Sequence, residues 1–196
     1  MIADCTALVF AGGDSRRMGR DKLALELGGQ SLLARALELM RGLFPHVLVS
    51  VQRPRNDVDA LQVCDEIPNA GPLAGLCAGL REAKTPWVFA VAADMPWLVP
   101  DIIERLAGFR AGHQATVPVI NEQVYPLTAF YAAKALPTLR TVLARPGKPG
   151  IVAALPLLDA CFVDERQLAG NEEASRHFID LDTPEDAALA YQFFGH

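Results

Sequence analysis

Strand-length apolar runs alternate with helical patterns along this chain, and this alternation restricts the fold more than any other feature. The runs are continuous, as in Leu8-Val9-Phe10-Ala11, which is typical of strands buried on both faces of a parallel sheet. Between residues 32 and 43, apolar side chains recur at three- and four-residue steps, which predicts one buried helical face. We therefore predict an α/β fold, a three-layer α/β/α sandwich around a mostly parallel, Rossmann-like central sheet. Strands are expected at 7–11, 47–51, 61–63, 87–92 and 115–119, and helices at 32–43, 73–81 and 102–109.

The second part of the chain is less regular. Its patterns predict strands at 127–131 and 160–163, and helices at 136–143, 149–155 and 184–194. The last helix is expected to be capped by Thr183 or Asp182. At 196 residues, 51% of them hydrophobic, the chain is long enough for one sizeable core and short for two. We therefore expect one domain over residues 1–196.

The first predicted strand ends in a glycine pair, Gly12-Gly13, and a short polar loop follows it. Glycine has no Cβ, so its backbone can approach a ligand closely, and successive N–H groups can converge on anionic oxygens. Arg16, Arg17 and Lys22 add positive charge close by. The loop fits neither Walker A, which ends in Gly-Lys-Ser/Thr, nor the spacing G-x-G-x-x-G. It still predicts phosphate binding; the alternative is an ordinary glycine turn with solvated arginines.

Two aspartates follow predicted strands directly: Asp65 after the third and Asp94 after the fourth. Because ligands of parallel sheets bind at the carboxyl ends of strands, we expect both to share one site with Gly12-Gly13. An aspartate at the end of an apolar strand must pair, accept hydrogen bonds or hold a cation. Mg²⁺ uses one or two carboxylates together with substrate phosphates. The alternatives are a cap for the helix beyond Pro96 in the case of Asp94, and a solvated loop acid in the case of Asp65.

Composition excludes several classes of function. The net charge is −5 and no basic stripe carries interleaved aromatic residues, which argues against nucleic acid as a partner. No apolar run reaches the roughly 20 residues that span a membrane, and no basic segment marks a signal peptide, so we expect a cytoplasmic protein without membrane contact. The four cysteines are dispersed, so we expect buried apolar roles for them rather than a disulfide framework or a zinc site.

Five sequence blocks occur in order between residues 8 and 186. The first is the loop, which reads A-G-G-x-S-x-R-M-G-x-D-K from Ala11 to Lys22. The others are G-P-L-A-G at 71–75, A-D-M-P at 93–96, Y-P-L-T-A-F-Y at 125–131 and F-I-D-L-D-T-P-E-D at 178–186. Together they resemble the blocks of the MobA family, the molybdenum cofactor guanylyltransferases.

The resemblance implies a nucleotide-diphospho-sugar transferase-like fold, with a nucleotide-binding half at about 1–110 and an acceptor-binding half at about 111–196. It also implies transfer of GMP from GTP to molybdopterin, with or without molybdenum, and release of pyrophosphate. Mg²⁺ would be the cofactor, with Asp94 as its ligand. The implied catalytic residues are Arg17, Lys22 and Asp94; the nucleotide-binding residues are Phe10, Ala11, Gly12, Gly13, Lys22, Ser50, Asp65 and Asp94; the acceptor-binding residues are Asp180 and Asp182.

The chain departs from the family pattern at four of these positions. Ser50 stands where the family often has asparagine, and Tyr125 stands where it has histidine. Asp180 and Asp182 replace two asparagines, and an ionised carboxylate only accepts hydrogen bonds. These departures leave open cytidylyl or other nucleotidyl transfer to molybdopterin or to a sugar phosphate. A non-catalytic nucleotide-binding partner or chaperone of molybdoenzymes is the third alternative.

Overall fold

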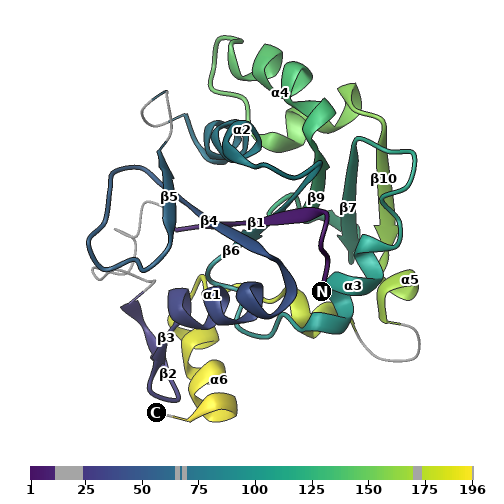
Figure 1. The fold of residues 1–196 in the computed structure, drawn as a ribbon. Coiled ribbons are helices and arrows are strands. Elements are labelled where there is room, and N and C mark those ends of the chain that lie inside the picture. The colour runs from purple at the N-terminus through teal and green to yellow at the C-terminus, as the bar shows by residue number, and fades with distance from the viewer. Residues whose placement is uncertain (12–23, 65–66, 68–69, 170–173, 196) are drawn as a thin grey trace.

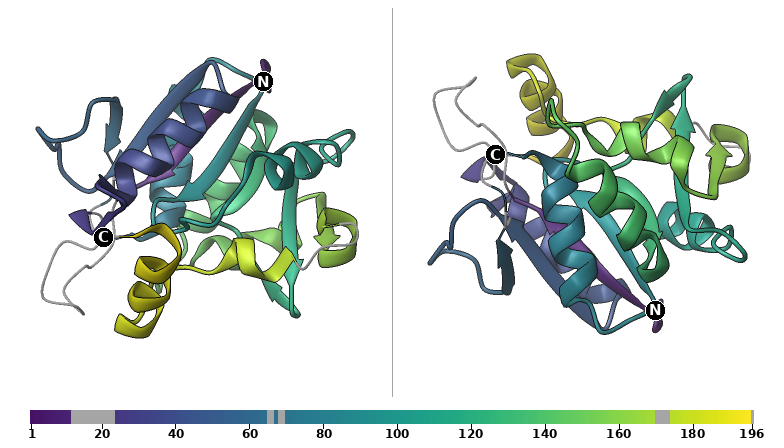
Figure 2. Two further views of the ribbon diagram at one scale, coloured as in Figure 1. Left: turned by 90° about the horizontal axis from the view of Figure 1, so that it is seen from below. Right: turned by 90° about the horizontal axis from the view of Figure 1, so that it is seen from above.

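The centre of the molecule is one mixed sheet with helices on both of its faces (Figures 1 and 2). The computed structural model describes residues 1–11, 24–64, 67, 70–169 and 174–195. The strands of this sheet are β1 (Cys5–Phe10), β4 (His46–Val51), β5 (Leu61–Cys64), β6 (Trp87–Ala92), β7 (Ala115–Ile120), β8 (Gln123–Val124), β9 (Thr128–Ala132) and β10 (Ala160–Asp164). Their order is β10-β7-β9-β6-β1-β4-β5, and β8 pairs with β7 at the side. The predicted three-layer α/β fold is confirmed.

The sheet is mostly parallel, but one of its inner strands runs in the opposite direction to both of its neighbours. β1 pairs in parallel with β4 and β6, β4 pairs in parallel with β5, and β10 pairs in parallel with β7. β9 runs antiparallel between β6 and β7. The chain from the end of β7 at Ile120 to the start of β9 at Thr128 is too short for a parallel crossover, which needs a dozen or more residues. The short connection therefore makes β9 antiparallel, a reversal that the apolar pattern did not predict.

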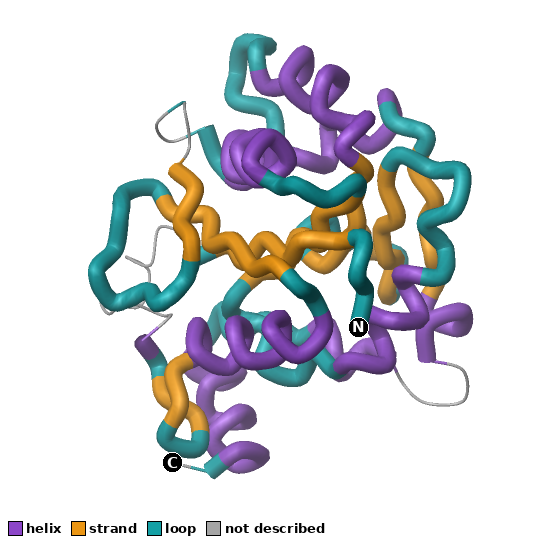
Figure 3. Tube along the Cα trace, viewed as in Figure 1, coloured by secondary structure: helices purple, strands orange, loops and turns teal. Residues whose placement is uncertain are grey.

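Helices cover the sheet in two layers, as the secondary-structure colouring shows (Figure 3). They are α1 (Leu32–Leu43), α2 (Pro72–Glu82), α3 (Pro100–Ala107), α4 (Leu136–Leu143), α5 (Glu165–Ala169) and α6 (Pro184–Phe194), with 3₁₀ turns η3 (Ala133–Ala135), η4 (Ile151–Leu157) and η5 (Ala174–Phe178). Side chains of α1, α3 and α5 share one hydrophobic core with one face of the sheet. Side chains of α2, α4 and η4 share a second core with the other face.

The central strand β1 supplies both cores. All six of its residues are buried; Ala7 and Val9 enter the first core, and Leu8 and Phe10 enter the second. Helix α2 packs closely over this strand because it has a glycine at the contact. A Cβ added at Gly79 would lie 2.3 Å from Cδ2 of Leu8. The buried central strand explains why the first run of the sequence is continuously apolar.

A third, smaller core joins the end of the chain to the segment before α1. Its buried members come from a short hairpin of β2 (Glu26–Leu27) and β3 (Gln30–Ser31), from α1 and from the α6 region: Leu27, Leu32, Leu181 and Ala190. The rings of Trp97 and Phe194 pack at its side with centroids 5.8 Å apart. The sequence did not predict this hairpin, because two-residue strands are too short to show a periodic pattern.

Most predicted elements are confirmed to within two residues, and those at 87–92, 136–143 and 184–194 match as predicted. The helix expected at 149–155 is instead the 3₁₀ turn η4, which contains Pro156. Proline lacks the N–H that an α-helical bond requires at that position. Within the described ranges, no helix is long and apolar enough to cross a membrane.

The cysteines differ from one another in exposure. Cys5 and Cys77 are buried as predicted, and burial raises the pKa of the Cys77 thiol to about 11. Cys161 is partly buried. Cys64 is exposed, and the prediction of a buried role for it was wrong, because it lies at the end of the edge strand β5.

Candidate active site

The carboxyl ends of β1, β4 and β6 meet at one edge of the sheet. In register, Phe10 lies beside Ser50 on β4 and beside Ala92 on β6. Beyond the strands, the amide of Ala11 donates to the carbonyl of Ser50 at 3.0 Å, and the amide of Ala93 donates to the carbonyl of Phe10 at 3.2 Å. The structure therefore brings Phe10, Ser50 and the start of the Asp94 turn together, while their roles there remain predictions.

Several predicted site residues lie outside the described part of the chain. These are Gly12, Gly13, Arg17, Lys22 and Asp65. The residues on either side of them are described: Ala11 at the end of β1 and Cys64 at the end of β5. The phosphate-loop assignment therefore rests on the sequence and on the position of β1 in the sheet.

The described residues at this edge are largely covered. Phe10, Ala11 and Ser50 are 8%, 5% and 4% exposed. These fractions refer to each whole residue, so both the side chains and the backbone of the three residues are largely shielded from solvent by the described part of the chain.

Asp94 lies in the turn that follows β6, half-buried and six residues before α3. The N-cap of α3 is Val99, which has no side-chain capping bond, and Pro100 occupies the first turn. The alternative that Asp94 caps this helix is therefore wrong. The turn is anchored by its neighbour Met95, which is buried and whose Sδ lies 3.0 Å from Oγ1 of Thr128.

The predicted acceptor segment is bonded directly to the Asp94 turn. The amide of Leu181 donates to the carbonyl of Asp94 at 3.1 Å, and the Leu181 side chain is 2% exposed in the third core. The residues on either side, Asp180 and Asp182, are exposed. A backbone hydrogen bond thus connects the turn of the predicted metal aspartate to the segment of the predicted acceptor aspartates, although the two are far apart in the sequence.

Asp182 also lies at the start of α6. Its amide donates to Oδ2 of Asp186 at 3.2 Å. Thr183 is the N-cap of α6, and its side chain and that of Asp186 form a capping box. The prediction that Thr183 or Asp182 caps this helix is confirmed for Thr183.

Tyr125 extends the acceptor side. Its ring packs edge-on against Phe178 with centroids 5.0 Å apart. Burial, and secondarily the negative charge of Asp180, raise the pKa of the Tyr125 hydroxyl. The phenol is therefore neutral at pH 7 and keeps a hydrogen-bond donor beside a carboxylate.

The sequence did not single out His177. This residue of η5 is buried, and its Nδ1 lies 2.7 Å from the carbonyl oxygen of Trp97 in the Asp94 turn. A lone histidine beside Phe178 carries no spacing signal, so only the fold could bring it to notice.

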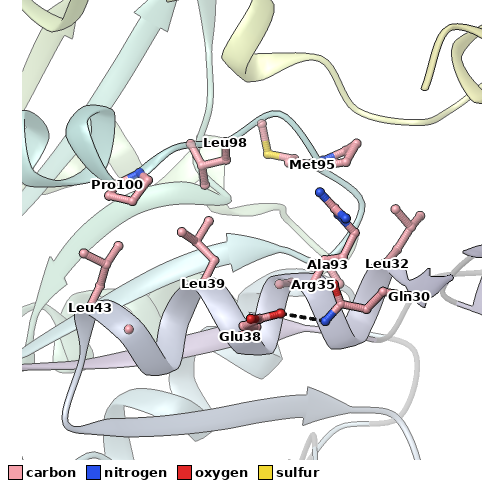
Figure 4. A pocket seen from close by; sticks show the side chains of 13 residues that line it. Gln30, Leu32, Arg35, Glu38, Leu39, Leu43, Ala93, Met95, Leu98 and Pro100 are labelled. Carbon is pink, nitrogen blue, oxygen red and sulfur yellow. Dashed lines mark hydrogen bonds between the residues drawn. The ribbon is translucent and has the colours of Figure 1, made fainter. Parts of the chain in front are cut away.

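A groove of about 500 Å³ lies between α1 and the turn after β6 (Figure 4). Its lining includes Arg35 and Leu39 from α1 and Ala93, Met95 and Leu98 from the turn. At its rim, Nε2 of Gln30 donates to Oε2 of Glu38 at 2.7 Å. Asp94 is not among the described residues that line this groove, but its neighbours Ala93 and Met95 are, so the groove adjoins the edge formed by β1 and β6.

The acidic side chains of the described residues could bind a metal ion only if water or substrate oxygens supplied most of its ligands. Outside the undescribed stretches, no group of three or more His, Cys, Asp or Glu side chains is arranged to hold an ion. A structural zinc site takes four protein ligands. Mg²⁺ is bound by one or two carboxylates and completes its shell with water and phosphate oxygens. The half-buried carboxylate of Asp94 at a strand end fits this second kind of ion.

Residues 7–160 match the model of a known protein family, which is described as "MobA-like NTP transferase domain". The probable molybdenum cofactor guanylyltransferase of Chloroflexus aggregans is 33% identical over 97% of this chain and 95% of its own length. The molybdenum cofactor guanylyltransferase of Syntrophotalea carbinolica is 30% identical over 92% of this chain and 88% of its own.

Solved structures agree with this match. Molybdopterin-guanine dinucleotide biosynthesis protein A from Archaeoglobus fulgidus superposes with a TM-score of 0.83 at 25% identity, covering 96% of this chain and 97% of that one. Rv0371C from Mycobacterium tuberculosis, solved in complex with manganese, has a TM-score of 0.67 at 16% identity, covering 98% of this chain and 100% of that one. At that identity the second likeness concerns the fold alone.

Proposed function

The chain belongs to the MobA-like NTP transferase family, and from this premise we propose that it is a molybdenum cofactor guanylyltransferase. It transfers GMP from GTP to molybdopterin, with or without molybdenum bound. A terminal phosphate oxygen of molybdopterin attacks the α-phosphorus of GTP and forms a new P–O bond. The bond from the α-phosphorus to the bridging oxygen breaks, and pyrophosphate leaves with that electron pair. The product is the molybdopterin guanine dinucleotide cofactor.

One observation carries this proposal: two relatives that bear this activity in their names are 30% and 33% identical over nearly the whole chain. The arrangement at the sheet edge is consistent with it. A phosphate nucleophile is already ionised, so the reaction needs no general base. Catalysis then consists mainly of positioning and of neutralising charge. Residues 1–196 would act as one domain, and the reaction would take place in the cytoplasm, where GTP is available.

On the nucleotide side, the backbone of Phe10, Ala11 and Gly12 would contact the base. Gly13, Arg17 and Lys22 would hold the phosphates, with amide dipoles and positive charge where the triphosphate is most negative. Ser50 and Asp65 would lie near the base or ribose. Of these residues, the described ones lie at the carboxyl ends of β1 and β4, where α/β sheets bind ligands.

Asp94 would hold a divalent cation, which we propose to be Mg²⁺. Such an ion would supply positive charge that lowers the free-energy cost of charge on the leaving pyrophosphate. Asp94 contributes the negative charge that attracts the cation. Its place in the turn after β6 keeps that charge at the edge where the nucleotide would bind.

On the acceptor side, Asp180 and Asp182 would bind molybdopterin. Their carboxylates accept hydrogen bonds, and a pterin ring offers N–H and NH₂ donors along one edge. Tyr125 adds an aromatic surface next to Asp180. Molybdoenzymes or their chaperones would be the partners that receive the finished cofactor.

The test is a nucleotide panel with purified protein, Mg²⁺ and molybdopterin. We expect pyrophosphate release with GTP and little with ATP, CTP or UTP, because the Ala11-Gly12-Gly13 loop resembles that of the guanylyl branch. Equal or better use of CTP would instead support cytidylyl transfer, the alternative that Ser50, Asp180 and Asp182 keep open. Binding of GTP without pyrophosphate release would favour a non-catalytic partner of molybdoenzymes.

A further inference from the structure

His177 is one of the few buried polar residues in the described part of the chain, with 8% of its surface exposed. A buried polar ring costs free energy unless its nitrogens are hydrogen bonded. Both nitrogens of His177 have partners. Nδ1 lies 2.7 Å from the carbonyl oxygen of Trp97, and Nε2 lies 3.3 Å from Nε of Arg176.

The two partners select one form of the ring. A carbonyl oxygen only accepts hydrogen bonds, so Nδ1 must carry a hydrogen and donate it to Trp97. The Nε of arginine only donates, so Nε2 must be the acceptor. Nδ1 of His177 therefore donates to the Trp97 carbonyl and holds it in a defined position.

Trp97 is the third residue after Asp94, in the same turn. This turn is fixed at its first residue by the bond from the amide of Ala93 to the carbonyl of Phe10, at 3.2 Å. From the other side, two bonds reach it from one short segment: the amide of Leu181 to Asp94 at 3.1 Å and the ring of His177 to Trp97 at 2.7 Å. The turn that carries the proposed metal ligand is thus held by the end of β1, by Thr128 of β9 through Met95, and by the segment 177–181.

We infer that His177 is a positioning residue for the transfer reaction, which fixes the Asp94 turn through the carbonyl of Trp97. This inference rests on the proposed function, in which Asp94 binds the cation. Removal of the Nδ1 donor leaves the Trp97 carbonyl without this bond and weakens the attachment of the turn to the segment 177–181. The Asp94 carboxylate then loses its fixed position relative to the nucleotide phosphates. Groups that orient a metal ligand in this way change metal affinity or activity by about 10- to 100-fold when removed.

The test compares two substitutions at this position. His177→Leu removes the donor, whereas His177→Asn keeps an N–H donor close to where Nδ1 lies. At saturating GTP and molybdopterin, we expect His177→Leu to raise the Mg²⁺ concentration for half-maximal pyrophosphate release about tenfold or more. His177→Asn should stay within about threefold of the parent, because its amide can replace the bond to Trp97.

A second measurement does not depend on activity. Hydrogen exchange of the Leu181 amide reports directly on its bond to the Asp94 carbonyl. We expect this amide to exchange faster in His177→Leu, while the amide of Val9 in the buried strand β1 keeps its protection. Thr6→Val is the matched control, since it removes a buried hydroxyl that lies 2.7 Å from Oγ1 of Thr85 at the opposite end of β1. It should lower stability without changing the Mg²⁺ dependence or Leu181 exchange.

A folded His177→Leu protein with parental Mg²⁺ dependence and parental Leu181 exchange would overturn the inference. So would a change of the same size in Thr6→Val, since the effect would then follow stability alone. If His177→Leu does not fold, His177→Gln takes its place, because the longer glutamine side chain puts the amide donor away from the Nδ1 position. Equal Mg²⁺ dependence and equal Leu181 exchange in His177→Gln and His177→Asn would also overturn the inference. If the parent releases no pyrophosphate from GTP, the proposed function fails, while Leu181 exchange still decides whether His177 holds the turn.

Discussion

The two sides of the candidate site are held in place by different kinds of interaction. On the nucleotide side, Phe10 and Ser50 belong to paired, buried strands, and the Asp94 turn begins directly after a third strand. On the acceptor side, the segment 177–183 belongs to no strand. It is held by the side chains of Phe178 and Leu181, which are buried in two of the cores, and by individual bonds to the Asp94 turn and to Asp186. The strand ends are fixed by backbone pairing with neighbouring strands, whereas the acceptor segment depends on buried side chains and on individual bonds. Substitutions at the strand ends should therefore change chemistry and leave folding intact.

The largest expected effect tests the nucleotide side at Asp94. Asp94→Asn keeps the shape of the side chain and removes the charge that attracts the cation. One oriented electrostatic contact of this kind is worth roughly 3 kcal/mol, so we expect a loss of about a hundredfold or more in single-turnover pyrophosphate release. The loss should persist at saturating GTP across a Mg²⁺ titration. Circular dichroism should show a folded protein.

Asp101→Asn is the control for this prediction, because Asp101 is exposed in the first turn of α3 and lies outside the site. It should release pyrophosphate at the parental rate. A folded Asp94→Asn protein with the parental rate and Mg²⁺ dependence would remove Asp94 from the chemistry. The Asp94 turn at the strand ends would then have a structural role and no part in the reaction.

The next effect concerns Lys22 and Arg17 in the predicted phosphate loop. Lys22→Ala and Arg17→Ala each remove one charge-assisted hydrogen bond to phosphate, worth about 1.5–3 kcal/mol, or roughly ten- to a hundredfold in kcat/KM for GTP. Thermal unfolding should be nearly unchanged, because loop charges contribute little to the core. Lys84→Ala, at an exposed lysine before β6, is the matched control. A variant at either loop position that uses GTP like the parent would contradict the assignment of that residue.

The difference between the paired strand ends and the irregular acceptor segment also explains how much of the site could be predicted from the sequence. Continuous apolar runs identify strands such as 87–92, and parallel packing predicts that Gly12-Gly13, Asp65 and Asp94 share one edge, whereas Phe10 and Ser50 were indicated by the family resemblance. The bond from Leu181 to Asp94 and that from His177 to Trp97 could not be predicted, because they join residues 87 and 80 positions apart with no periodic pattern between them. The resemblance to a known family indicated Asp180 and Asp182 without showing that their segment holds the Asp94 turn.

A smaller effect tests the acceptor side at Asp180. Asp180→Ala should raise the KM for molybdopterin by about tenfold, because an exposed carboxylate that accepts one hydrogen bond is worth little more than about 1.5 kcal/mol. Affinity for GTP, measured by calorimetry without acceptor, should stay at the parental value. Glu185→Ala, an exposed acid in the first turn of α6, controls for the loss of charge. A rise in KM for GTP instead of molybdopterin would assign Asp180 to the nucleotide side and break the comparison.

The smallest effect concerns the cap that ends the acceptor segment. The hydroxyl of Thr183 accepts from the amide of Asp186 at 3.1 Å, so Thr183→Ala leaves that amide without its cap. Loss of an N-cap costs about 1 kcal/mol, which urea unfolding should show as a lower midpoint with an unchanged slope. Thr141→Ala is the matched control, since Thr141 lies within α4 and its hydroxyl only donates back to the carbonyl of Pro137. That substitution should leave stability the same or slightly higher, because alanine favours a helix interior. If the two variants are equally stable, the capping box does not fix the start of α6, and the acceptor segment depends on fewer bonds than its geometry indicates.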